Sequence, residues 1–154
     1  MNKIKLLFMD VDGTLTDGMI YMSNQGELMK AFNVKDGYAI HNILPYYDIV
    51  PIIITGRSCK ILKMRCDEIG IKEIYQGVSN KLEMFDSIIK RYNVSYDNVA
   101  YIGDDINDLK CMVKSGISGC PADAVKEVKE ISDFVAYSNG GKGAVRDFIE
   151  WLCK

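Results

Sequence analysis

The chain has 154 residues, of which 48% are hydrophobic and 26% are charged, and its 19 basic and 21 acidic residues give a net charge of −2. This length fits a single domain over residues 1–154, and the charge excludes a dedicated nucleic-acid binder or a polybasic membrane anchor. No apolar run approaches the roughly 20 residues that a membrane-spanning helix needs, so no membrane partner is expected.

Short apolar runs, rich in β-branched residues, alternate with longer helical patterns along the chain. Strands are predicted, in chain order, at residues 4–9, 49–54, 99–102 and 134–136, with weaker candidates at 73–75 and 117–119. Helices are predicted over residues 58–69, 80–92 and 142–152, and Asn80 with Glu83 resembles a capping box at the start of the second. Near-continuous hydrophobicity is typical of parallel strands covered on both faces. The alternation therefore predicts an α/β fold with a doubly wound parallel sheet.

Residues 18–32 (GMIYMSNQGELMKAF) interrupt this alternation. Two short strands joined at residues 23–26 predict a small β-hairpin, inserted directly after the first strand. The apolar residues of this segment exceed what a solitary hairpin can cover, so we expect it to pack against another subunit. Its methionines are interpreted as packing surface and not as a metal site.

The cysteines and the single histidine favour neither a disulfide framework nor a transition-metal site. The five cysteines are odd in number and form no CxxC pair, and His41 has no acidic partner nearby in the sequence. We interpret the cysteines as reduced thiols of a cytoplasmic protein, and His41 as a residue of a helix face.

Polar residues follow the predicted strands at their carboxyl ends. They are, in chain order, Asp10 and Asp12, then Thr55, Gly56 and Arg57, then Lys81 at the start of a helix, and finally Asp104, Asp105 and Asp108. In open α/β sheets ligands bind beyond these strand ends, so the groups are expected to converge. Residues i and i+2 of an extended segment lie about 6.5–7 Å apart on one side. Asp10 and Asp12 are therefore expected to straddle one reacting group.

The charges of these residues indicate the chemistry. Asp10, Asp12 and Asp104 in one crevice would repel one another unless a cation lay among them. Ligation by a few carboxylates and waters is the preference of Mg²⁺. A carboxylate nucleophile combined with a divalent ion, a hydroxyl group and an ammonium group suits phosphoryl transfer. In this interpretation Asp10 attacks phosphorus, while Thr55 and Lys81 absorb charge on the transferring group.

The chain resembles the haloacid dehalogenase superfamily of phosphatases, whose four motifs it matches in order and spacing over essentially its whole length. These motifs read Asp10-x-Asp12-Gly-Thr, Thr55-Gly, Lys81 and Gly103-Asp104-Asp105-x-x-Asp108. More narrowly, DVDGTLTDG, the short hairpin, F-x-V-x-DG at 32–37, ITGR-S and the tail GG-x-GAVRD resemble the 3-deoxy-D-manno-octulosonate 8-phosphate (KDO 8-phosphate) phosphatase family. The resemblance implies a Rossmann-like core without a cap domain. It also implies a homotetramer that forms through the hairpins, with each active site closed by a neighbouring subunit.

The resemblance also implies roles for the acidic residues. Asp10 is then the nucleophile that becomes an aspartyl phosphate, and Asp12 is the general acid that protonates the leaving sugar hydroxyl and later the base that activates water. The carboxylates of Asp10 and Asp104 and the backbone carbonyl of Asp12 would hold Mg²⁺. Asp108 would fix Lys81 or a metal-bound water, with Asp105 in a supporting role.

Substrate-binding residues are implied in the same way. Thr55, with the adjacent Gly56, and Lys81 would bind the phosphoryl oxygens. Arg57 and Arg65 would face the carboxylate or the sugar of the substrate, Arg65 from the neighbouring subunit, because an arginine fork suits a planar carboxylate. Lys142 and Arg146 in the tail are further candidates of this kind. For the arginines the alternative is an ordinary surface position, and for the tail it is a flexible connection into the last helix.

Three other functions are weighed against a KDO 8-phosphate phosphatase. A receiver domain would carry an aspartate after the third strand of its sheet, and here that strand's counterpart ends without one. A non-catalytic tetramerisation module of a sugar-nucleotide synthetase system would be expected to lose the nucleophile or the acids of the fourth motif, and this chain keeps both. Phosphatases of KDN 9-phosphate or N-acylneuraminate 9-phosphate share the scaffold. Arg57, which follows Thr55 and Gly56, and Glu68, one turn past Arg65, favour KDO 8-phosphate, whose sugar acid has eight carbons.

Overall fold

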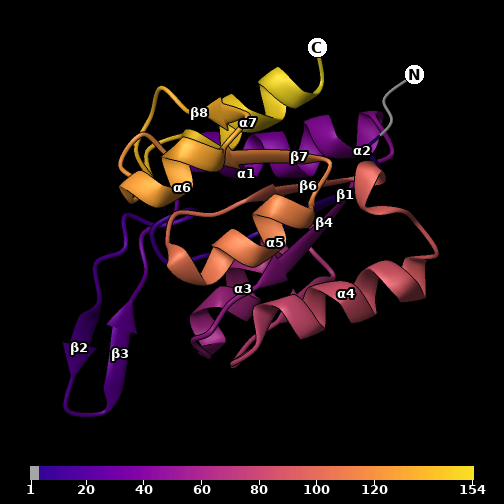
Figure 1. The fold of residues 1–154 in the computed structure, drawn as a ribbon. Helices are drawn as coiled ribbons and strands as arrows, with labels where there is room; N and C mark the ends of the chain where they lie inside the picture. Colours follow the sequence, from indigo (N-terminus) through magenta and orange to yellow (C-terminus); the bar gives the residue numbers. More distant parts are fainter. Residues whose placement is uncertain (1–3) are drawn as a thin grey trace.

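A parallel six-stranded sheet of order β5-β4-β1-β6-β7-β8 forms the centre of the molecule (Figure 1). The computed structural model describes residues 4–154. The strands of this sheet are β1 (Leu6–Met9), β4 (Val50–Ile54), β5 (Glu73–Tyr75), β6 (Val99–Ile102), β7 (Ile117–Cys120) and β8 (Phe134–Val135). The predicted strands, including the two weaker candidates, are confirmed with small shifts at their ends.

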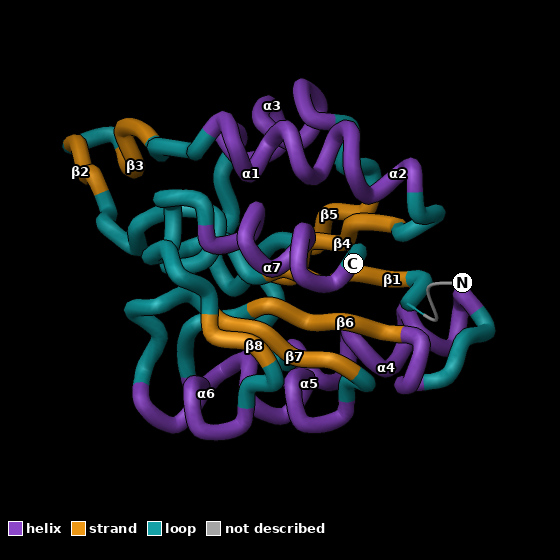
Figure 2. The backbone as a smooth tube through the Cα atoms, turned by 90° about the horizontal axis from the view of Figure 1, so that it is seen from above, coloured by secondary structure: helices purple, strands orange, loops and turns teal. Residues whose placement is uncertain are grey.

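Helices cover both faces of the sheet, so the predicted doubly wound α/β class is confirmed. They are α1 (Val34–Tyr38), the π-helix η1 (Ala39–Ile43), α2 (Leu44–Tyr46), α3 (Lys60–Ile69), α4 (Lys81–Tyr92), α5 (Leu109–Lys114), α6 (Lys126–Ile131) and α7 (Ala144–Leu152), with short 3₁₀ helices η2 (Tyr96–Asn98) and η3 (Ile106–Asp108). In Figure 2, α1, α2, α3 and α7 lie on one side of the sheet and α4, α5 and α6 on the other.

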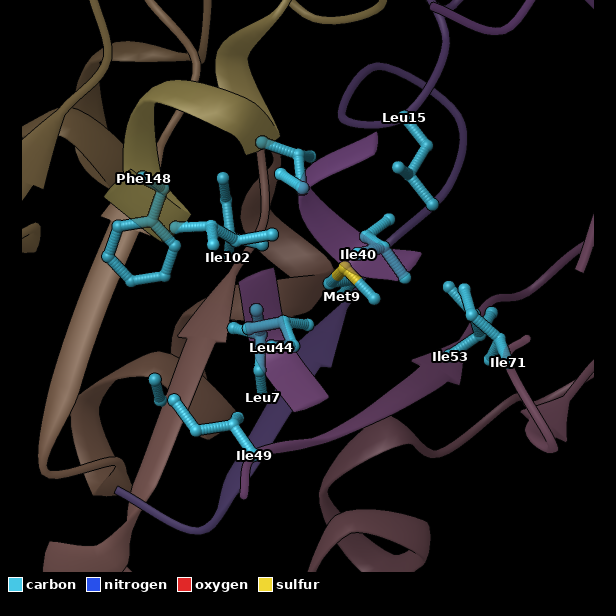
Figure 3. Close-up of a cluster of buried hydrophobic side chains, with 14 of the residues drawn as sticks. Leu7, Met9, Leu15, Ile40, Leu44, Ile49, Ile53, Ile71, Ile102 and Phe148 are labelled. Atoms are coloured by element: carbon cyan, nitrogen blue, oxygen red, sulfur yellow. The ribbon is translucent and has the colours of Figure 1, made fainter. Parts of the chain in front are cut away.

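The pleat of the central strand divides the core into two halves, because alternate side chains of a strand point to opposite faces. Leu7 and Met9 of β1 pack with α3 and α7 residues on one face, part of which is drawn in Figure 3. Leu6 and Phe8 pack with residues of α4, α5 and α6 on the other. All four side chains are buried, which explains the uninterrupted apolar run of this strand.

Local sequence determines where the helices begin and end. The side chain of Asn80 accepts a hydrogen bond of 3.1 Å from the backbone N–H of Glu83, so α4 starts at Lys81. The predicted helix over 58–69 instead starts at Lys60, after Cys59 in an extended conformation. The predicted helix over 142–152 starts two residues late, because Gly143 adopts φ +111°, which lies outside the helical region.

The inserted hairpin is confirmed and stands away from the main sheet (Figure 1). Its antiparallel strands β2 (Tyr21–Ser23) and β3 (Gly26–Met29) are joined by a tight turn, with Ser23 opposite Gly26. Met19, Met22 and Leu28 are each more than 60% exposed. The hairpin therefore presents an uncovered apolar surface, as the sequence predicts.

Two further expectations concern the cysteines and His41. The five cysteines are free thiols, and all except Cys59 are buried. His41 lies on η1, and its Nδ1 atom is 3.2 Å from the carbonyl oxygen of Ile69, which agrees with a place on a helix face. Within residues 4–154, each helix is too short or too polar to cross a membrane.

Candidate active site

Strand register brings the polar segments to one edge of the sheet. Met9 at the end of β1 pairs with Ile53 of β4 on one side and with Ile102 of β6 on the other. The backbone N–H of Asp10 then donates a hydrogen bond of 3.1 Å to the carbonyl of Ile102. The nucleophile candidate is thus held on the central strand, between the segments that follow β4 and β6.

A cleft of about 180 Å³ lies at this edge. Its lining consists of Asp10, Asp12, Thr55, Gly56, Arg57, Asp104, Asp105 and Asn107. Seven of these eight residues are predicted site residues, and Asn107 belongs to the same loop as Asp104. The structure therefore brings together the segments after β1, β4 and β6, as expected for the carboxyl ends of parallel strands.

Three carboxylates and one ammonium group form the buried floor of the site. Oxygen atoms of Asp10, Asp104 and Asp108 lie within 4.8 Å of one another. The Nζ atom of Lys81 donates hydrogen bonds to Asp10 Oδ1 at 2.7 Å and to Asp108 Oδ1 at 2.8 Å. Lys81 reaches this position because α4 begins directly beside the cleft. If all three carboxyl groups were ionised, one ammonium group would leave two of the three negative charges uncompensated.

This surplus of buried negative charge shifts the pKa values of the groups. Burial, together with the charge of Asp108, raises the pKa of Asp10. Burial, with a hydrogen bond to Asp10 and the charges of Asp10 and Asp108, raises the pKa of Asp104 to about 9. Burial would lower the pKa of Lys81, but the adjacent carboxylates outweigh burial and raise it. The ammonium of Lys81 is therefore kept charged.

Asp108 is occupied by protein donors. The Tyr101 hydroxyl donates a hydrogen bond of 2.8 Å to Asp108 Oδ1, and the backbone N–H groups of Asp104 and Asp105 donate to Oδ2 at 3.2 and 3.4 Å. Asp108 thus orients Lys81 and ties the loop after β6. Tyr101 was not predicted, because its place in the strand VAYI indicates only a core residue.

Two glycines leave room for the carboxylates of Asp104 and Asp108 to pack directly against the backbone. Gly13 adopts φ +93°, and a Cβ atom there would overlap the carboxylate of Asp104. A Cβ atom at Gly103 would overlap the carboxyl group of Asp108. The glycines of the DxDGT and GDD motifs are therefore required by space, and at Gly13 by backbone conformation as well.

The tail packs on the loop that follows β1. The backbone N–H of Gly141 donates a hydrogen bond of 3.1 Å to the carbonyl of Thr14, and a Cβ atom at Gly140 would overlap the carbonyl of Gly13. Lys142 is exposed and lies outside the residues that line the cleft. Arg146 instead packs over the ring of Tyr38 and pairs with Glu150. Within one chain, the tail supports the loop through its glycines.

Asp12 is held by a second, separate group of charges. The Nζ atom of Lys30 donates hydrogen bonds to Asp12 Oδ1 at 2.6 Å and to Glu27 Oε2 at 3.0 Å. Arg57 lies near both acids, 3.9 Å from Asp12 Oδ2 and 3.8 Å from Glu27 Oε1. Lys30 and Glu27 were not predicted. The only signal in the sequence is that these two residues are the only charged ones in residues 18–32.

Arg65 is not part of this cleft within one chain. It lies on α3, where it donates a hydrogen bond of 3.2 Å to Glu68 and stacks over the ring of Phe32 at 5.9 Å. It lines a different, small cavity that also includes Asp36. Its Nε atom is buried without a hydrogen-bond partner in the described structure. Of the predicted arginines Arg57, Arg65 and Arg146, only Arg57 is brought to the acids.

The donor set of the cleft fits a Mg²⁺ ion. Burial raises the pKa of both Asp10 and Asp104, and the charge of Asp108 adds to this at each, so a divalent cation bound between Asp10 and Asp104 would stabilise their ionised forms. The oxygens gathered here are carboxylate oxygens, which are hard ligands of the kind Mg²⁺ takes. Asp108 is less suited as a ligand because its oxygens already accept hydrogen bonds from Lys81, Tyr101 and the backbone.

Comparison with known proteins agrees with this site. A profile of haloacid dehalogenase-like hydrolases matches residues 54–149, and this is the class that the fold and the acidic cluster define. The 3-deoxy-D-manno-octulosonate 8-phosphate phosphatase of Escherichia coli K12 is 47% identical over 149 residues, which are 97% of this chain and 79% of that protein. The chain therefore belongs to the 3-deoxy-D-manno-octulosonate 8-phosphate phosphatase family of the haloacid dehalogenase-like hydrolases.

Solved structures give the same result. The phosphatase of this name from Yersinia pestis superposes with a TM-score of 0.93 at 43% identity, over 98% of this chain and 81% of that chain. The phosphatase from Moraxella catarrhalis, solved in complex with a magnesium ion, a phosphate ion and KDO, also has a TM-score of 0.93. It is 37% identical, over 98% of this chain and 86% of that chain.

Proposed function

We propose that this protein is a Mg²⁺-dependent phosphatase that hydrolyses KDO 8-phosphate through an aspartyl-phosphate intermediate. The observation that carries the proposal is the pairing of two aspartates two residues apart with two different ammonium groups. Asp10 is held by Lys81 on the cleft floor, and Asp12 is held by Lys30 at its side. One carboxylate is thus placed for attack and the other for proton transfer. The family relationship and the ligands of the Moraxella catarrhalis enzyme support the same substrate.

The first half of the reaction transfers the phosphoryl group to the protein. An Asp10 carboxylate oxygen attacks phosphorus, and the bond from phosphorus to the sugar oxygen breaks. Asp12 gives its proton to that leaving oxygen, so the sugar departs as a neutral alcohol. Lys81, and the hydroxyl of Thr55 beside the backbone of Gly56, bind the phosphoryl oxygens and stabilise the charge on them.

The second half of the reaction restores the enzyme. Asp12, now a carboxylate, takes a proton from a water molecule as that water attacks the phosphorus of the aspartyl phosphate. The bond between phosphorus and Asp10 breaks, and inorganic phosphate is released. Asp12 recovers in this step the proton that it donated in the first. Buried Asp108 keeps Lys81 in place through both steps.

Asp10, Asp104 and the backbone carbonyl of Asp12 would hold the magnesium ion. When bound, Mg²⁺ neutralises the negative charge that gathers as a phosphate dianion meets a carboxylate nucleophile. Asp105, whose side chain accepts a hydrogen bond of 2.7 Å from the backbone N–H of Ile106, keeps the loop that carries Asp104 in shape.

We also propose a homotetramer in the cytoplasm, assembled through the exposed hairpins. The exposed methionines and Leu28 of the hairpin support assembly, and the free thiols support a reducing compartment. Arg57, which lies beside the acids, would bind the distal carboxylate or sugar within the same subunit. Arg65 and Lys142 lie outside the cleft of their own chain, so each would act on the site of a neighbour.

A phosphate-release panel tests the substrate. Purified enzyme with Mg²⁺ is given KDO 8-phosphate, KDN 9-phosphate and N-acetylneuraminate 9-phosphate, with Asp10→Asn as the inactive control. We expect the highest kcat/KM with KDO 8-phosphate. A preference for either nine-carbon substrate would reassign the sugar acid, and release from none of them would instead favour an assembly module.

A further inference from the structure

We propose that Lys30, held by Glu27, is a positioning residue for proton transfer by Asp12. The inference rests on the proposed phosphatase function and adds a part to its machinery. The residues come from the inserted hairpin, since Glu27 belongs to β3 and Lys30 follows directly after that strand.

Lys30 occupies one oxygen of the Asp12 carboxyl group. Its Nζ atom lies 2.6 Å from Asp12 Oδ1, a short distance typical of a charge-assisted hydrogen bond. Arg57 Nε lies 3.9 Å from the other oxygen, Oδ2, which is beyond hydrogen-bond distance. Asp12 also lines the cleft. Oδ2 is therefore the oxygen left to carry the proton to and from the reacting group.

The contact between Lys30 and Asp12 differs from an exposed ion pair on the surface, because its lysine is almost fully buried. The side chain of Lys30 is only 3% exposed and that of Glu27 only 7%. Exposed pairs contribute little, because both side chains are solvated and mobile. Here the side chains of Lys30 and Glu27 are nearly buried and that of Asp12 is 19% exposed, so water screens their contacts less than on the surface and each group fixes the geometry of the next.

Glu27 gives Lys30 its direction. Its Oε2 atom accepts a hydrogen bond of 3.0 Å from Lys30, while its Oε1 atom faces Arg57 at 3.8 Å. The ammonium is thereby aimed at Asp12 and away from Asp10, which has its own partner in Lys81. Asp10 and Asp12 thus bind different lysines, which agrees with separate roles for Asp10 as nucleophile and Asp12 in proton transfer.

Without Lys30, the Asp12 carboxyl group can rotate and its two oxygens become equivalent. Proton transfer to the leaving oxygen then loses its orientation, while attack by Asp10 and binding by Lys81 remain. The loss is largest for leaving groups that are strong bases and need the proton most. It is smallest for p-nitrophenolate, which departs as a stable anion.

The test compares the leaving-group dependence of kcat/KM in wild type and in Lys30→Met. A series of aryl phosphates from p-nitrophenyl phosphate to phenyl phosphate is used, because kcat/KM reports the steps up to the transfer to Asp10. We expect Lys30→Met to lower kcat/KM for phenyl phosphate about 30-fold or more, and for p-nitrophenyl phosphate less than about three-fold. Lys110→Met, at an exposed position on α5, is the matched control and should leave both values unchanged.

The comparison holds even where a variant is partly unfolded, since a lower active fraction reduces every kcat/KM by the same factor. Lys30→Gln, which keeps a hydrogen-bond donor without the charge, provides a second variant with a smaller disturbance of the buried acids. It should give an intermediate leaving-group dependence. Glu27→Ala, which frees the ammonium, should shift the dependence in the same direction as Lys30→Met.

An equal loss for all leaving groups in Lys30→Met would overturn the proposal and make Lys30 a structural residue. A higher KM alone would also overturn it, in favour of a substrate contact. The aryl phosphates carry no sugar acid, so an error in the proposed substrate leaves this test intact. Absence of any phosphate release from the wild-type enzyme would instead overturn the phosphatase function itself, and this inference with it.

Discussion

Asp36 Oδ1 accepts a hydrogen bond of 2.8 Å from the backbone N–H of Arg146, a residue 110 positions further along the chain. This bond joins α1 to the first turn of α7, where the N–H groups of a helix need acceptors. The other oxygen, Oδ2, is buried without a hydrogen-bond partner in the described structure. Burial, opposed by the hydrogen bond from Arg146, raises the pKa of Asp36 to about 6.

The raised pKa of Asp36 predicts a change of stability with pH. In the unfolded chain this carboxyl group has a pKa of 3.8, so the folded form binds its proton more tightly. The stabilisation is fully present below about pH 4 and is lost as the pH rises through 6. Between pH 4 and pH 7, wild type should lose on the order of 2 kcal/mol more free energy of unfolding than Asp36→Asn. Urea unfolding at both pH values measures this, with the exposed Asp67→Asn as control; equal pH slopes would contradict it.

Asp10→Asn should abolish turnover and keep the fold. The amide still offers an oxygen to Lys81, but it cannot form an aspartyl phosphate, so kcat should fall about 1000-fold or more. Because one of three adjacent carboxylates is neutralised, the melting temperature in EDTA should equal or exceed that of wild type. Steady-state kinetics and thermal unfolding check both parts. Substantial remaining turnover would rule out Asp10 as the nucleophile.

Magnesium should stabilise the protein apart from its role in activity. Binding between Asp10 and Asp104 relieves their repulsion, so Mg²⁺ should raise the melting temperature of protein first treated with EDTA. Burial holds the pKa of Asp104 at about 9 without the ion, so binding at pH 7.5 should also release protons. Calorimetry in buffers of different ionisation enthalpy detects them. Asp104→Asn should show neither effect, and a full response in that variant would place the ion elsewhere.

The hairpin surface can be tested by adding charge. Met22 and Leu28 are 63% and 62% exposed, so Met22→Asp with Leu28→Asp should leave the subunit folded but separate the tetramer. Light scattering at micromolar concentration measures the mass. Val113→Asp, at a similarly exposed apolar position on α5, is the control and should remain tetrameric. A wild-type monomer would contradict the proposed assembly.

Removal of Arg65 or of Arg57 should weaken binding of the sugar acid more than it slows chemistry. Both would contact the distal part of the substrate in the ground and transition states alike, so KM should rise more than kcat falls. Hydrolysis of p-nitrophenyl phosphate, which has no carboxylate, should change little. Arg91→Ala, at an exposed arginine paired with Glu73, is the control. Equal damage to both substrates would make the altered arginine structural.

The sequence predicts the sheet and the floor of the site well, for a common physical reason. A parallel strand covered on both faces must be apolar throughout, so runs such as residues 99–102 are distinctive. The carboxyl ends of these strands must meet at one edge, so the positions of Asp10 and Asp104 directly after two strands predict that they converge there. The segment that forms α1, η1 and α2 lacks such a signal, since Gly37 and Pro45 interrupt its helical pattern.

The contacts of Asp12 with Lys30 and of Asp108 with Tyr101 could not be predicted because they depend on distant packing. Lys30 is near Asp12 only because the hairpin returns to the cleft, and no periodicity of residues 18–32 encodes that return. Tyr101 looks like any aromatic core residue, and only the structure shows that its hydroxyl meets Asp108. The proposed contribution of Arg65 to the site of a neighbour depends on the position of a second subunit, which strand and helix patterns do not specify.

The position of β1 in the middle of the sheet has a consequence for synthesis of the chain. Strand β1 precedes the other five strands of the sheet in the chain, yet its partners are residues 50–54 on one side and residues 99–102 on the other. During synthesis on the ribosome, the edge of β1 that pairs with β6 therefore stays unpaired until residue 102 has emerged. Parallel pairing across such separations is slow and leaves an unpaired edge open to other chains. We expect translation pauses or chaperone binding before that point to influence yield more than equal pauses after it.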